Sequence, residues 1–330
     1  MSQSRLLCIL LNYRTAEMCA RAARAAVTAM EGLDAELVIV DNASGDGSFA
    51  ALRDMVAEAG WPHVRVVDAG RNGGFGAGNN HGIRAGRSDG LAPEYVYILN
   101  PDAFPEPDAI HVLTNWLDAH PKTGIAGSLI RNEAGAQEYT AFRFPTAAGE
   151  FEGASRFGPI SRLLRRSRVP LDLPQQAQPV DWLAGASMML RREMLDQIGL
   201  FDETFFLYFE ETDLCRRAAR AGWQTDYLPQ SQVMHIGSVS TGMKRWDRVP
   251  QYWLDSRLHY FTKNHGAGYA LLATLSHAGG ALIWRLRKAV HRRPDLDPPH
   301  FLRDLLAHHV RALLSRPARR AAHPSAKRLP

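Results

Sequence analysis

Four short apolar runs recur at even spacing through the first hundred residues, and helix-like stretches separate them. The apolar runs cover residues 5–11, 36–40, 64–67 and 95–99. The helix-like stretches between and after them cover residues 15–30, 48–59, 79–86 and about 107–119. Buried-strand patterns that alternate with helices indicate an α/β protein with a Rossmann-like, mostly parallel sheet and helices on both faces.

Polar residues stand where each of these predicted strands ends. The strand ends are Asn12-Tyr13, Asp41-Asn42, Asp68 and Asn100-Pro101-Asp102. Open sheets of this kind bind ligands at the carboxyl ends of their strands. The sequence therefore predicts a ligand site along this edge.

The second half of the chain is less regular. Its patterns predict a helix over residues 210–221 and strands over residues 137–144, 180–190 and 224–228. A length of 330 residues leaves room for one large domain or two modest ones.

Residues 72–80, Asn-Gly-Gly-Phe-Gly-Ala-Gly-Asn-Asn, are dense in glycine. Glycine lets the backbone approach a ligand closely, and the N-terminus of a following helix favours phosphate. The spacing Gly-x-Gly-x-Gly after the third strand does not match the dinucleotide-binding pattern, which follows the first strand. A tight, closely packed turn is the alternative interpretation.

Asp102 and His235 are candidate metal ligands. Asp102 follows the fourth strand, and Asp108 is better placed to cap the next helix, which leaves Asp102 available. Hard divalent cations take oxygen ligands and keep substrate phosphates as partners. His235 ends a short apolar run, where a histidine serves either packing or metal binding.

An aromatic run leads into three acids, Glu210, Glu211 and Asp213. Acids at a helix start complement the helix dipole. Alternatively, an apolar setting raises the pKa of one carboxyl and makes it a general base. Adjacent Glu210 and Glu211 cannot share one helix face, so their roles should differ. Glu210 or Asp213 can also pair with Arg216 or Arg217.

The net charge of +5 comes from the C-terminal end of the chain. Residues 281–330 hold 12 Lys+Arg and 3 Asp+Glu, a balance of 12 − 3 = +9, so residues 1–280 carry 5 − 9 = −4. The apolar segment 269–284 precedes this basic end, a pattern typical of an interfacial membrane helix. A helix that docks onto the domain is the alternative.

Three scattered cysteines imply no disulfide framework and suit a reducing compartment. The first 14 residues lack the pattern of a signal peptide, and no run of 18 apolar residues predicts a membrane span. We therefore expect a cytoplasmic protein.

Taken in order, the motifs resemble those of the family 2 glycosyltransferases with the GT-A fold, and within them the bacterial rhamnosyltransferase-like branch. The resemblance covers about residues 5–265 and rests on Leu11–Tyr13, Val40–Ser48, Asn72–Asn79, Leu99–Asp102, Gly185-Ala186, Phe209–Arg216 and His235. It implies a GT-A domain over residues 1–265, followed by a basic helical extension over 266–330 that can associate with a membrane. Within the domain, a nucleotide-binding half covers about residues 1–130 and an acceptor-binding half about 131–265.

The resemblance also implies site residues. Asn100-Pro-Asp102 corresponds to a metal-binding Asp-x-Asp motif with Asn in the first place, so Asp102 and His235 would hold Mg²⁺ or Mn²⁺. Glu211 corresponds to the catalytic base, with Glu210 as the competing assignment. The acceptor side would include Trp182, Gly185 and Asp213. The donor would be held by Asn12, Tyr13, Asp41, Asn42, Asn72, Gly73, Gly74, Gly78, Asn79, Asn100 and Asp102.

The activity implied is inverting transfer of a sugar, rhamnose from dTDP-rhamnose, to a hydroxyl of a saccharide or lipid-linked acceptor in surface polysaccharide synthesis. The place implied is the inner face of the plasma membrane, with an anionic membrane surface as a partner of the basic end. Because Asn100 lowers the ligand charge, an inactive nucleotide-sugar-binding scaffold is the alternative. Nucleic acid is not an expected partner, since the basic end lacks interleaved aromatic residues and any known module.

Overall fold

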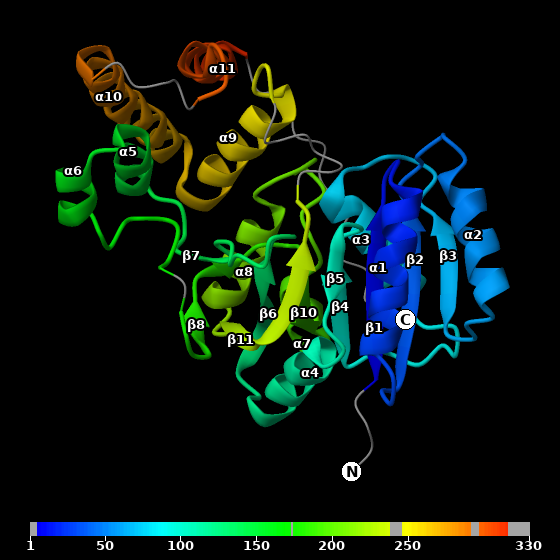
Figure 1. The fold of residues 1–330 in the computed structure, drawn as a ribbon. Helices are drawn as coiled ribbons and strands as arrows, with labels where there is room; N and C mark the ends of the chain where they lie inside the picture. The colour runs from blue at the N-terminus through cyan, green and yellow to red at the C-terminus, as the bar shows by residue number, and fades with distance from the viewer. Residues whose placement is uncertain (1–4, 173, 238–245, 292–296, 316–330) are drawn as a thin grey trace. The chain divides into compact units, whose positions relative to one another are not determined.

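The computed structural model describes residues 5–172, 174–237, 246–291 and 297–315. The chain forms two compact units (Figure 1). Unit 1 comprises residues 1–142 and 170–242, and unit 2 comprises residues 143–169 and 243–330. This grouping differs from the predicted boundary after residue 265, because the segments 143–169 and 251–265 pack with the C-terminal helices.

Unit 1 is built on a mixed sheet, which in the described part of the chain has nine strands in the order β3-β2-β1-β4-β10-β6-β11-β5, with β8 beside β11. A smaller sheet pairs β7 (Ala141–Phe142) with β9 (Trp182–Leu183). The strands of the large sheet are β1 (Leu6–Asn12), β2 (Ala35–Asp41), β3 (Val64–Asp68), β4 (Tyr95–Leu99), β5 (Ala103–Pro105), β6 (Thr123–Arg131), β8 (Gln178–Val180), β10 (Ser187–Arg191) and β11 (Gln224–His235).

Strands β1 to β4 are parallel, as predicted, and β10 runs antiparallel between β4 and β6. The register pairs Asn12 with Asp41, and Asp41 with Asp68. The polar strand ends therefore lie along one edge of the sheet.

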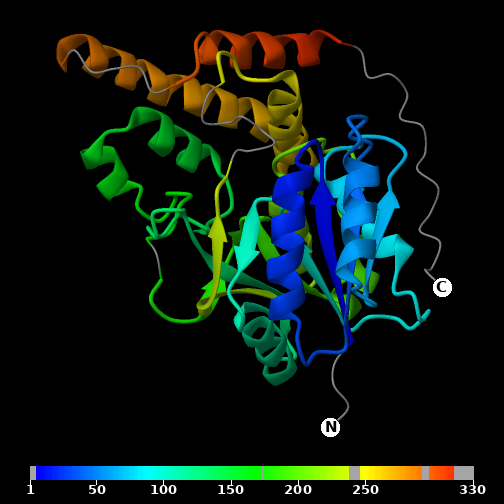
Figure 2. The same ribbon diagram turned by 45° about the vertical axis from the view of Figure 1, so that its right-hand side comes forward.

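Helices cover both faces of this sheet (Figures 1 and 2). Side chains of β1 alternate between the faces, so Leu6, Cys8 and Leu10 pack in the cluster that contains the alanines of α1, whereas Ile9 lies against Gly82 of α3. On the first face, α1 (Ala16–Ala29) contacts α2 (Ser48–Ala59) and α4 (Ala109–Ala119), and the second face carries α3 (Phe75–Ala85), α7 (Arg192–Ile198) and α8 (Glu210–Arg220). The α/β fold prediction is confirmed.

Four predicted elements differ in extent from those of the structure. The predicted strand 137–144 is reduced to Ala141–Phe142, and the predicted strand 224–228 extends to His235. The stretch 180–190 is interrupted, since a turn around Gly185 separates β9 from β10. Helix α3 begins at Phe75, inside the glycine-dense stretch, because the Phe75 N–H donates to the Phe206 carbonyl oxygen at 2.9 Å. The helix N-terminus therefore lies at the loop itself.

Unit 2 is helical in its described part. Its helices are α5 (Ala147–Ser155), α6 (Gly158–Leu163), α9 (Gln251–His265), α10 (Ala267–His291) and α11 (Phe301–Leu314). Helix α10 approaches α5 closely at Gly280, where a Cβ atom would lie 2.4 Å from the Phe151 carbonyl oxygen.

An ion pair joins three helices of unit 2. Glu150 of α5 lies 2.9 Å from Arg257 of α9 and 2.8 Å from His277 of α10. Burial acts to raise the pKa of Glu150, but Arg257 and His277 outweigh it and lower the pKa to about 2. The carboxylate therefore stays charged and holds α5, α9 and α10 together.

The predicted apolar segment 269–284 lies within α10. Among the described helices, none combines the length and the apolar character that crossing a bilayer requires. Arg292, Arg293 and residues 316–330 of the basic end lie outside the described residues.

Candidate active site

The ends of β1 and β2 are joined by a buried hydrogen-bond network. Asn12 Nδ2 donates to Asp41 Oδ1 at 2.7 Å. Ser44 donates to the same carboxylate twice, through Oγ at 2.6 Å and through its N–H at 3.0 Å. These contacts fix Asp41 and the turn after it. Ser44 was not predicted as a site residue, although serine is typical of polar turns such as residues 41–48.

Asn42 connects this network to the glycine-dense loop. Its Nδ2 donates to Asn72 Oδ1 at 3.0 Å and to the Gly74 carbonyl oxygen at 3.2 Å. Asn72 Oδ1 also accepts the Gly74 N–H at 3.0 Å. The Asn42 Oδ1 atom is buried and has no hydrogen-bond partner within the described chain. It is thus an acceptor available to a donor group of a ligand.

The glycine-dense loop packs against the segment that precedes the acidic cluster. Gly74 has φ +88°, and a Cβ atom there would lie 1.8 Å from the Phe206 carbonyl oxygen. At Gly78 a Cβ atom would lie 2.4 Å from Leu11 Cδ1, and at Gly73 one would lie 2.7 Å from Ala77 Cβ. Close packing accounts for these glycines, and it brings two distant segments of the chain into contact.

We predict that Gly74→Ala destabilises the protein by about 3 kcal/mol, because the new Cβ atom would combine backbone strain with a clash against backbone. The matched control is Gly70→Ala, where φ is +71° but nothing lies within 4 Å of the added atom. That control should cost about 1 kcal/mol, the strain alone. Urea unfolding of both variants measures the difference, and equal costs would contradict the packing argument.

The acidic cluster opens helix α8 after a strained turn. Tyr208 and Phe209 both have φ 69°, a left-handed conformation that is costly for residues other than glycine. The turn delivers Glu210 and Glu211 to the first positions of the helix. Strain of this kind is commonly found where side-chain placement matters for function.

Burial raises the pKa of both glutamates. Glu210 is only 2% exposed, and burial together with the neighbouring Glu211 charge holds its pKa well above the usual range. Glu211 is partly exposed, and burial of its carboxyl raises the pKa to about 7. The Oε2 atoms of both carboxyls are buried without a hydrogen-bond partner in the part of the chain described. Glu211 therefore has a pKa suited to a general base at neutral pH, and its Oε2 atom is available to accept a proton.

Asn100, Asp102 and His235 meet at the β4 end of the same edge. His235 Nε2 lies 3.1 Å from Asp102 Oδ1 and 3.4 Å from Asn100 Nδ2. The contact arises because β11 pairs with β5 and places His235 opposite Ala103. Asn100 Oδ1 is buried without a partner among the described residues.

One turn joins this group to the acidic cluster. The Asn100 N–H donates to the Ala186 carbonyl oxygen at 3.1 Å. At the preceding residue, Gly185, a Cβ atom would lie 3.2 Å from the Phe75 ring and 4.0 Å from Glu211 Cβ. The structure thus brings Asn100, Glu211 and Phe75, the first residue of α3, next to the same small turn.

The remaining predicted residues lie in distinct settings. Trp182 stacks on Phe142, with ring centroids 4.2 Å apart. Tyr13 lies beside the Arg14 guanidinium, 5.2 Å from the ring centroid. Asn79 is buried within α3 and donates to the Phe75 carbonyl oxygen.

Asp213, predicted on the acceptor side, has no exposed surface, and its Oδ2 accepts from Arg217 Nε at 2.8 Å. This geometry favours the structural role that the sequence had left open for Asp213. It leaves Glu210 and Glu211 as the acids available for chemistry.

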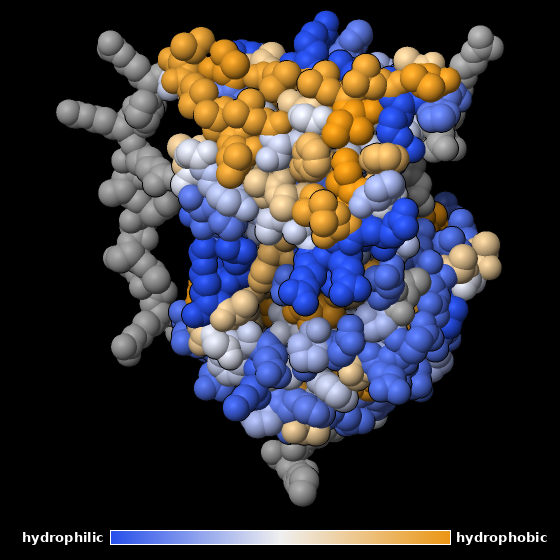
Figure 3. Space-filling view, turned by 90° about the vertical axis from the view of Figure 1, so that its left-hand side faces the viewer, coloured by the Kyte–Doolittle hydropathy of each residue, from blue (hydrophilic) through white to orange (hydrophobic). Residues whose placement is uncertain are grey.

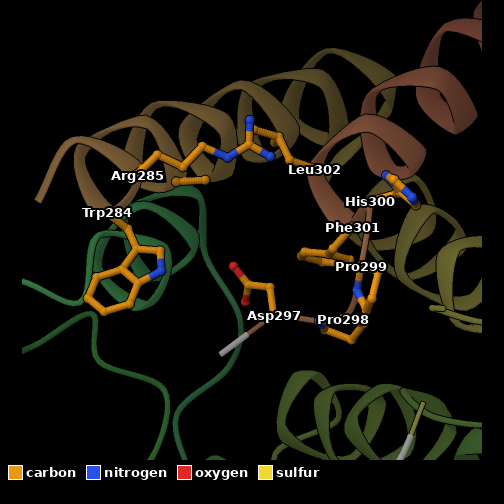
Figure 4. Close-up of a pocket in the computed structure, with 9 residues that line it drawn as sticks. Trp284, Arg285, Asp297, Pro298, Pro299, His300, Phe301 and Leu302 are labelled. Carbon is orange, nitrogen blue, oxygen red and sulfur yellow. The ribbon is translucent and has the colours of Figure 1, made fainter. Parts of the chain in front are cut away.

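A pocket of about 50 Å³ in unit 2 has room for little more than water. Trp284 and Asp297 face its space (Figure 4). Sites for small ligands are typically about 300–1,000 Å³, and none of the residues predicted for the site lines this pocket. This pocket is therefore not a candidate active site, whereas the polar residues gathered at the edge of the sheet in unit 1 are.

A mostly parallel sheet with polar residues at the ends of β1, β2 and β4, together with a carboxyl suited to proton transfer, fits a glycosyltransferase of the GT-A fold. The protein-family model described as "Glycosyltransferase like family 2" matches residues 5–251. The chain belongs to this family, and the prediction of a glycosyltransferase enzyme is confirmed.

Curated relatives agree with this assignment. N-acetylglucosaminyl-diphospho-decaprenol L-rhamnosyltransferase of Mycobacterium tuberculosis is 31% identical over 274 residues, which are 79% of this chain and 82% of the relative. A low-salt glycan biosynthesis hexosyltransferase of Haloferax volcanii is 30% identical over 237 residues, 70% of this chain and 67% of the relative. The Escherichia coli rhamnosyltransferase WbbL is 25% identical over 178 residues, 52% of this chain and 65% of the relative. The chain is thus similar to rhamnosyltransferases within the family.

A solved structure confirms the fold. The mannosyltransferase PcManGT of Pyrobaculum calidifontis, in complex with GDP-Man and Mn²⁺, aligns with a TM-score of 0.53 at 15% identity. The alignment covers 95% of this chain and 87% of that one. At this identity the likeness concerns the GT-A fold alone.

Proposed function

We propose that this enzyme transfers rhamnose, with inversion, from dTDP-rhamnose to a hydroxyl of a saccharide or lipid-linked acceptor in the synthesis of a surface glycan. The names of the M. tuberculosis and E. coli relatives support the sugar, and the first of them supports a lipid-linked acceptor. The observation that carries the mechanism is Glu211, a carboxyl with a raised pKa that a single turn connects to Asn100 and Asp102.

In the proposed mechanism Glu211 accepts the proton of the acceptor hydroxyl. The hydroxyl oxygen attacks the anomeric carbon and forms the new C–O bond. The bond from that carbon to the diphosphate breaks on the opposite face, and its electron pair leaves with the nucleoside diphosphate. Attack opposite to the leaving group inverts the anomeric configuration. Asp41 and Asn42, fixed by their hydrogen bonds, would hold the nucleoside.

Asp102 and His235 fit a divalent cation, since they offer a carboxylate and an imidazole 3.1 Å apart. Asn100 lies beside them, with Nδ2 as its atom nearest to His235 and with Oδ1 buried without a partner in the described chain. Oxygen and imidazole ligands suit Mn²⁺, and Mg²⁺ favours oxygen with substrate phosphates. The described residues contain no group of three His, Cys, Asp or Glu that could hold a metal ion, so a cation here would also need diphosphate oxygens and water as ligands. Bound there, Mg²⁺ or Mn²⁺ would stabilise negative charge on the leaving diphosphate.

The proposed place of action is the cytoplasmic side, at the inner face of the plasma membrane. The buried free thiols of Cys8, Cys19 and Cys215 suit a reducing compartment. A lipid-linked acceptor would be reached from that side.

The pH profile provides a test of Glu211. Burial raises the pKa of Glu211 to about 7, so below that pH the carboxyl is protonated and cannot accept a proton. We predict that kcat/KM rises with pH through about 7 and then levels off. The rate is measured with dTDP-rhamnose and a soluble acceptor between weakly acidic and weakly alkaline pH. A profile that is flat through neutrality would contradict the assignment of Glu211 as the base.

The donor is tested by incubating the purified protein with dTDP-rhamnose, UDP-glucose and GDP-mannose, with and without Mn²⁺. We expect transfer from dTDP-rhamnose alone, and NMR of the product should show the inverted anomeric configuration. Transfer from another sugar nucleotide would overturn the proposed donor but keep the enzyme class. Nucleotide binding without any turnover would instead support the inactive scaffold.

A further inference from the structure

Exposed large apolar side chains are concentrated on two helices of unit 2. Of the thirteen such side chains in the described part of the chain, nine lie on α10 and α11. Figure 3 shows apolar residues gathered in a band over these helices. A concentration of this kind, in contrast to scattered single residues, marks an interaction surface.

Five of these side chains form one stripe along α10, which we call the leucine stripe. They follow one another at intervals of 4, 7, 4 and 4 residues, so they share one helix face. They extend over about 28 Å at 1.5 Å per residue. The leucine stripe consists of Leu271 (37% exposed), Leu275 (54%), Leu282 (55%), Leu286 (70%) and Val290 (76%).

The leucine stripe is not the face by which α10 packs in its own unit. The buried residues Ala270, Ala273, Ala281 and Trp284 lie on the opposite side of the helix. They are mostly small, as the close approach of α5 requires. Helix α10 therefore has one apolar face that packs inside unit 2 and a second apolar face that is open to the surroundings.

Helix α11 adds a similar outer face that carries positive charge. Val310, Leu313 and Leu314 are 52%, 58% and 78% exposed. By helical spacing, Arg303 lies on the same face as Val310 and Leu314, and Arg311 lies at its border. Both arginines are exposed. On α10, exposed Arg285 borders the leucine stripe in the same way.

We propose that the leucine stripe and the outer face of α11 bind the surface of an anionic lipid bilayer. Leucines at the level of the acyl chains, bordered by arginines that reach phosphate headgroups, are the combination that holds an interfacial helix on a membrane. The inference deepens the proposed function and rests on it in one respect, namely that a lipid-linked acceptor would be presented at that same surface.

The charge pattern favours a bilayer over a second copy of this chain. A symmetric dimer through the leucine stripe would bring Arg285 of each copy to the same interface, and like charges there oppose association. An anionic membrane instead attracts them, each contributing about 1 kcal/mol near the surface.

The experiment is cosedimentation of the full chain with vesicles of phosphatidylcholine, or of an equal mixture of phosphatidylcholine and phosphatidylglycerol. We expect binding to the mixed vesicles. The triple variant Leu275→Gln, Leu282→Gln, Leu286→Gln should bind at least about 10-fold more weakly, because it removes the apolar area that enters the bilayer. These side chains are exposed, so the variant should fold. The matched control Leu91→Gln with Tyr139→Gln, exposed residues of unit 1, should bind like the wild type.

A second variant tests the charge. Arg285→Gln, Arg303→Gln, Arg311→Gln should weaken binding to the mixed vesicles, and added salt should weaken wild-type binding in the same way. Unchanged vesicle binding by the leucine variant would overturn the proposal. So would a wild-type dimer that does not bind vesicles and that the leucine variant dissociates.

Transfer to a soluble acceptor separates this proposal from the proposed function. The leucine variant should retain that transfer, since it touches no residue of the sheet edge. If the wild type binds vesicles through the leucine stripe but transfers no sugar, the proposed function is wrong and the membrane-binding proposal is supported. If the wild type transfers sugar but does not bind vesicles, the membrane-binding proposal is wrong and the proposed function is supported.

Discussion

Glu211→Gln is expected to lower the rate of sugar transfer about 10²–10⁴-fold, the usual contribution of a general base. Binding of the sugar nucleotide should stay unchanged, because Glu211 faces the turn at Gly185 and makes no described contact with Asp41 or Asn42. Glutamine has the same size and cannot accept the proton. The measurements are single-turnover rates with a soluble acceptor and the dissociation constant for dTDP-rhamnose.

The neighbouring Glu210 provides the most informative control. Burial, together with the neighbouring Glu211 charge, raises the pKa of Glu210 well above its usual range. The shift favours the protonated form, which cannot accept a proton, so Glu210→Gln should retain most of the activity. The exposed Glu94→Gln controls for the loss of a surface charge. Retained turnover in Glu211→Gln, with loss in Glu210→Gln, would make Glu210 the base.

Much of the first half of the fold could be predicted because its signals are local. Strands β1 to β4 are apolar runs that end in polar residues, and helices α1, α2 and α4 lie within two residues of their predicted bounds. Strand β6, by contrast, was not predicted. Two glycines interrupt its pattern, and they are needed because Met194 packs at Gly124 and Leu183 at Gly127. These packing contacts involve distant segments of the chain, so the sequence of the strand alone does not reveal them.

The site shows the same division between local and distant signals. The strand-end residues Asn12 and Asp41 and the acids Glu210 and Glu211 follow from short motifs, and the structure connects Asn12 with Asp41 directly. The loop and the turn that position these residues depend on contacts between segments that are far apart in sequence. The packing of Gly74 on Phe206 and the bond from Asn100 to Ala186 set the positions of the loop and the turn. No periodicity or spacing encodes those pairs.

Asp102→Asn is the second substitution with a large expected effect. We predict a loss of about 10³-fold in transfer rate, since a cation at a leaving phosphate contributes several kcal/mol and 1.36 kcal/mol corresponds to tenfold. Asparagine preserves the shape of the buried side chain, so the fold should persist. Mn²⁺ binding, followed by calorimetry in the presence of dTDP, should weaken in parallel. The exposed Asp196→Asn, which replaces a surface partner of Arg192, should leave both quantities unchanged.

The asparagine at position 100 determines how strongly cation binding should depend on Asp102. With Asn100 in the motif, Asp102 is its remaining carboxylate, so cation binding at this site should depend on Asp102 more strongly than if two acids shared the charge. Asn100→Asp should therefore tighten Mn²⁺ binding in the wild-type background and restore part of it in Asp102→Asn. If the wild type transfers rhamnose in excess EDTA and Asp102→Asn is fully active, the cation has no role in the reaction. If Mn²⁺ and dTDP bind but neither the wild type nor Asn100→Asp transfers sugar, the chain is a scaffold.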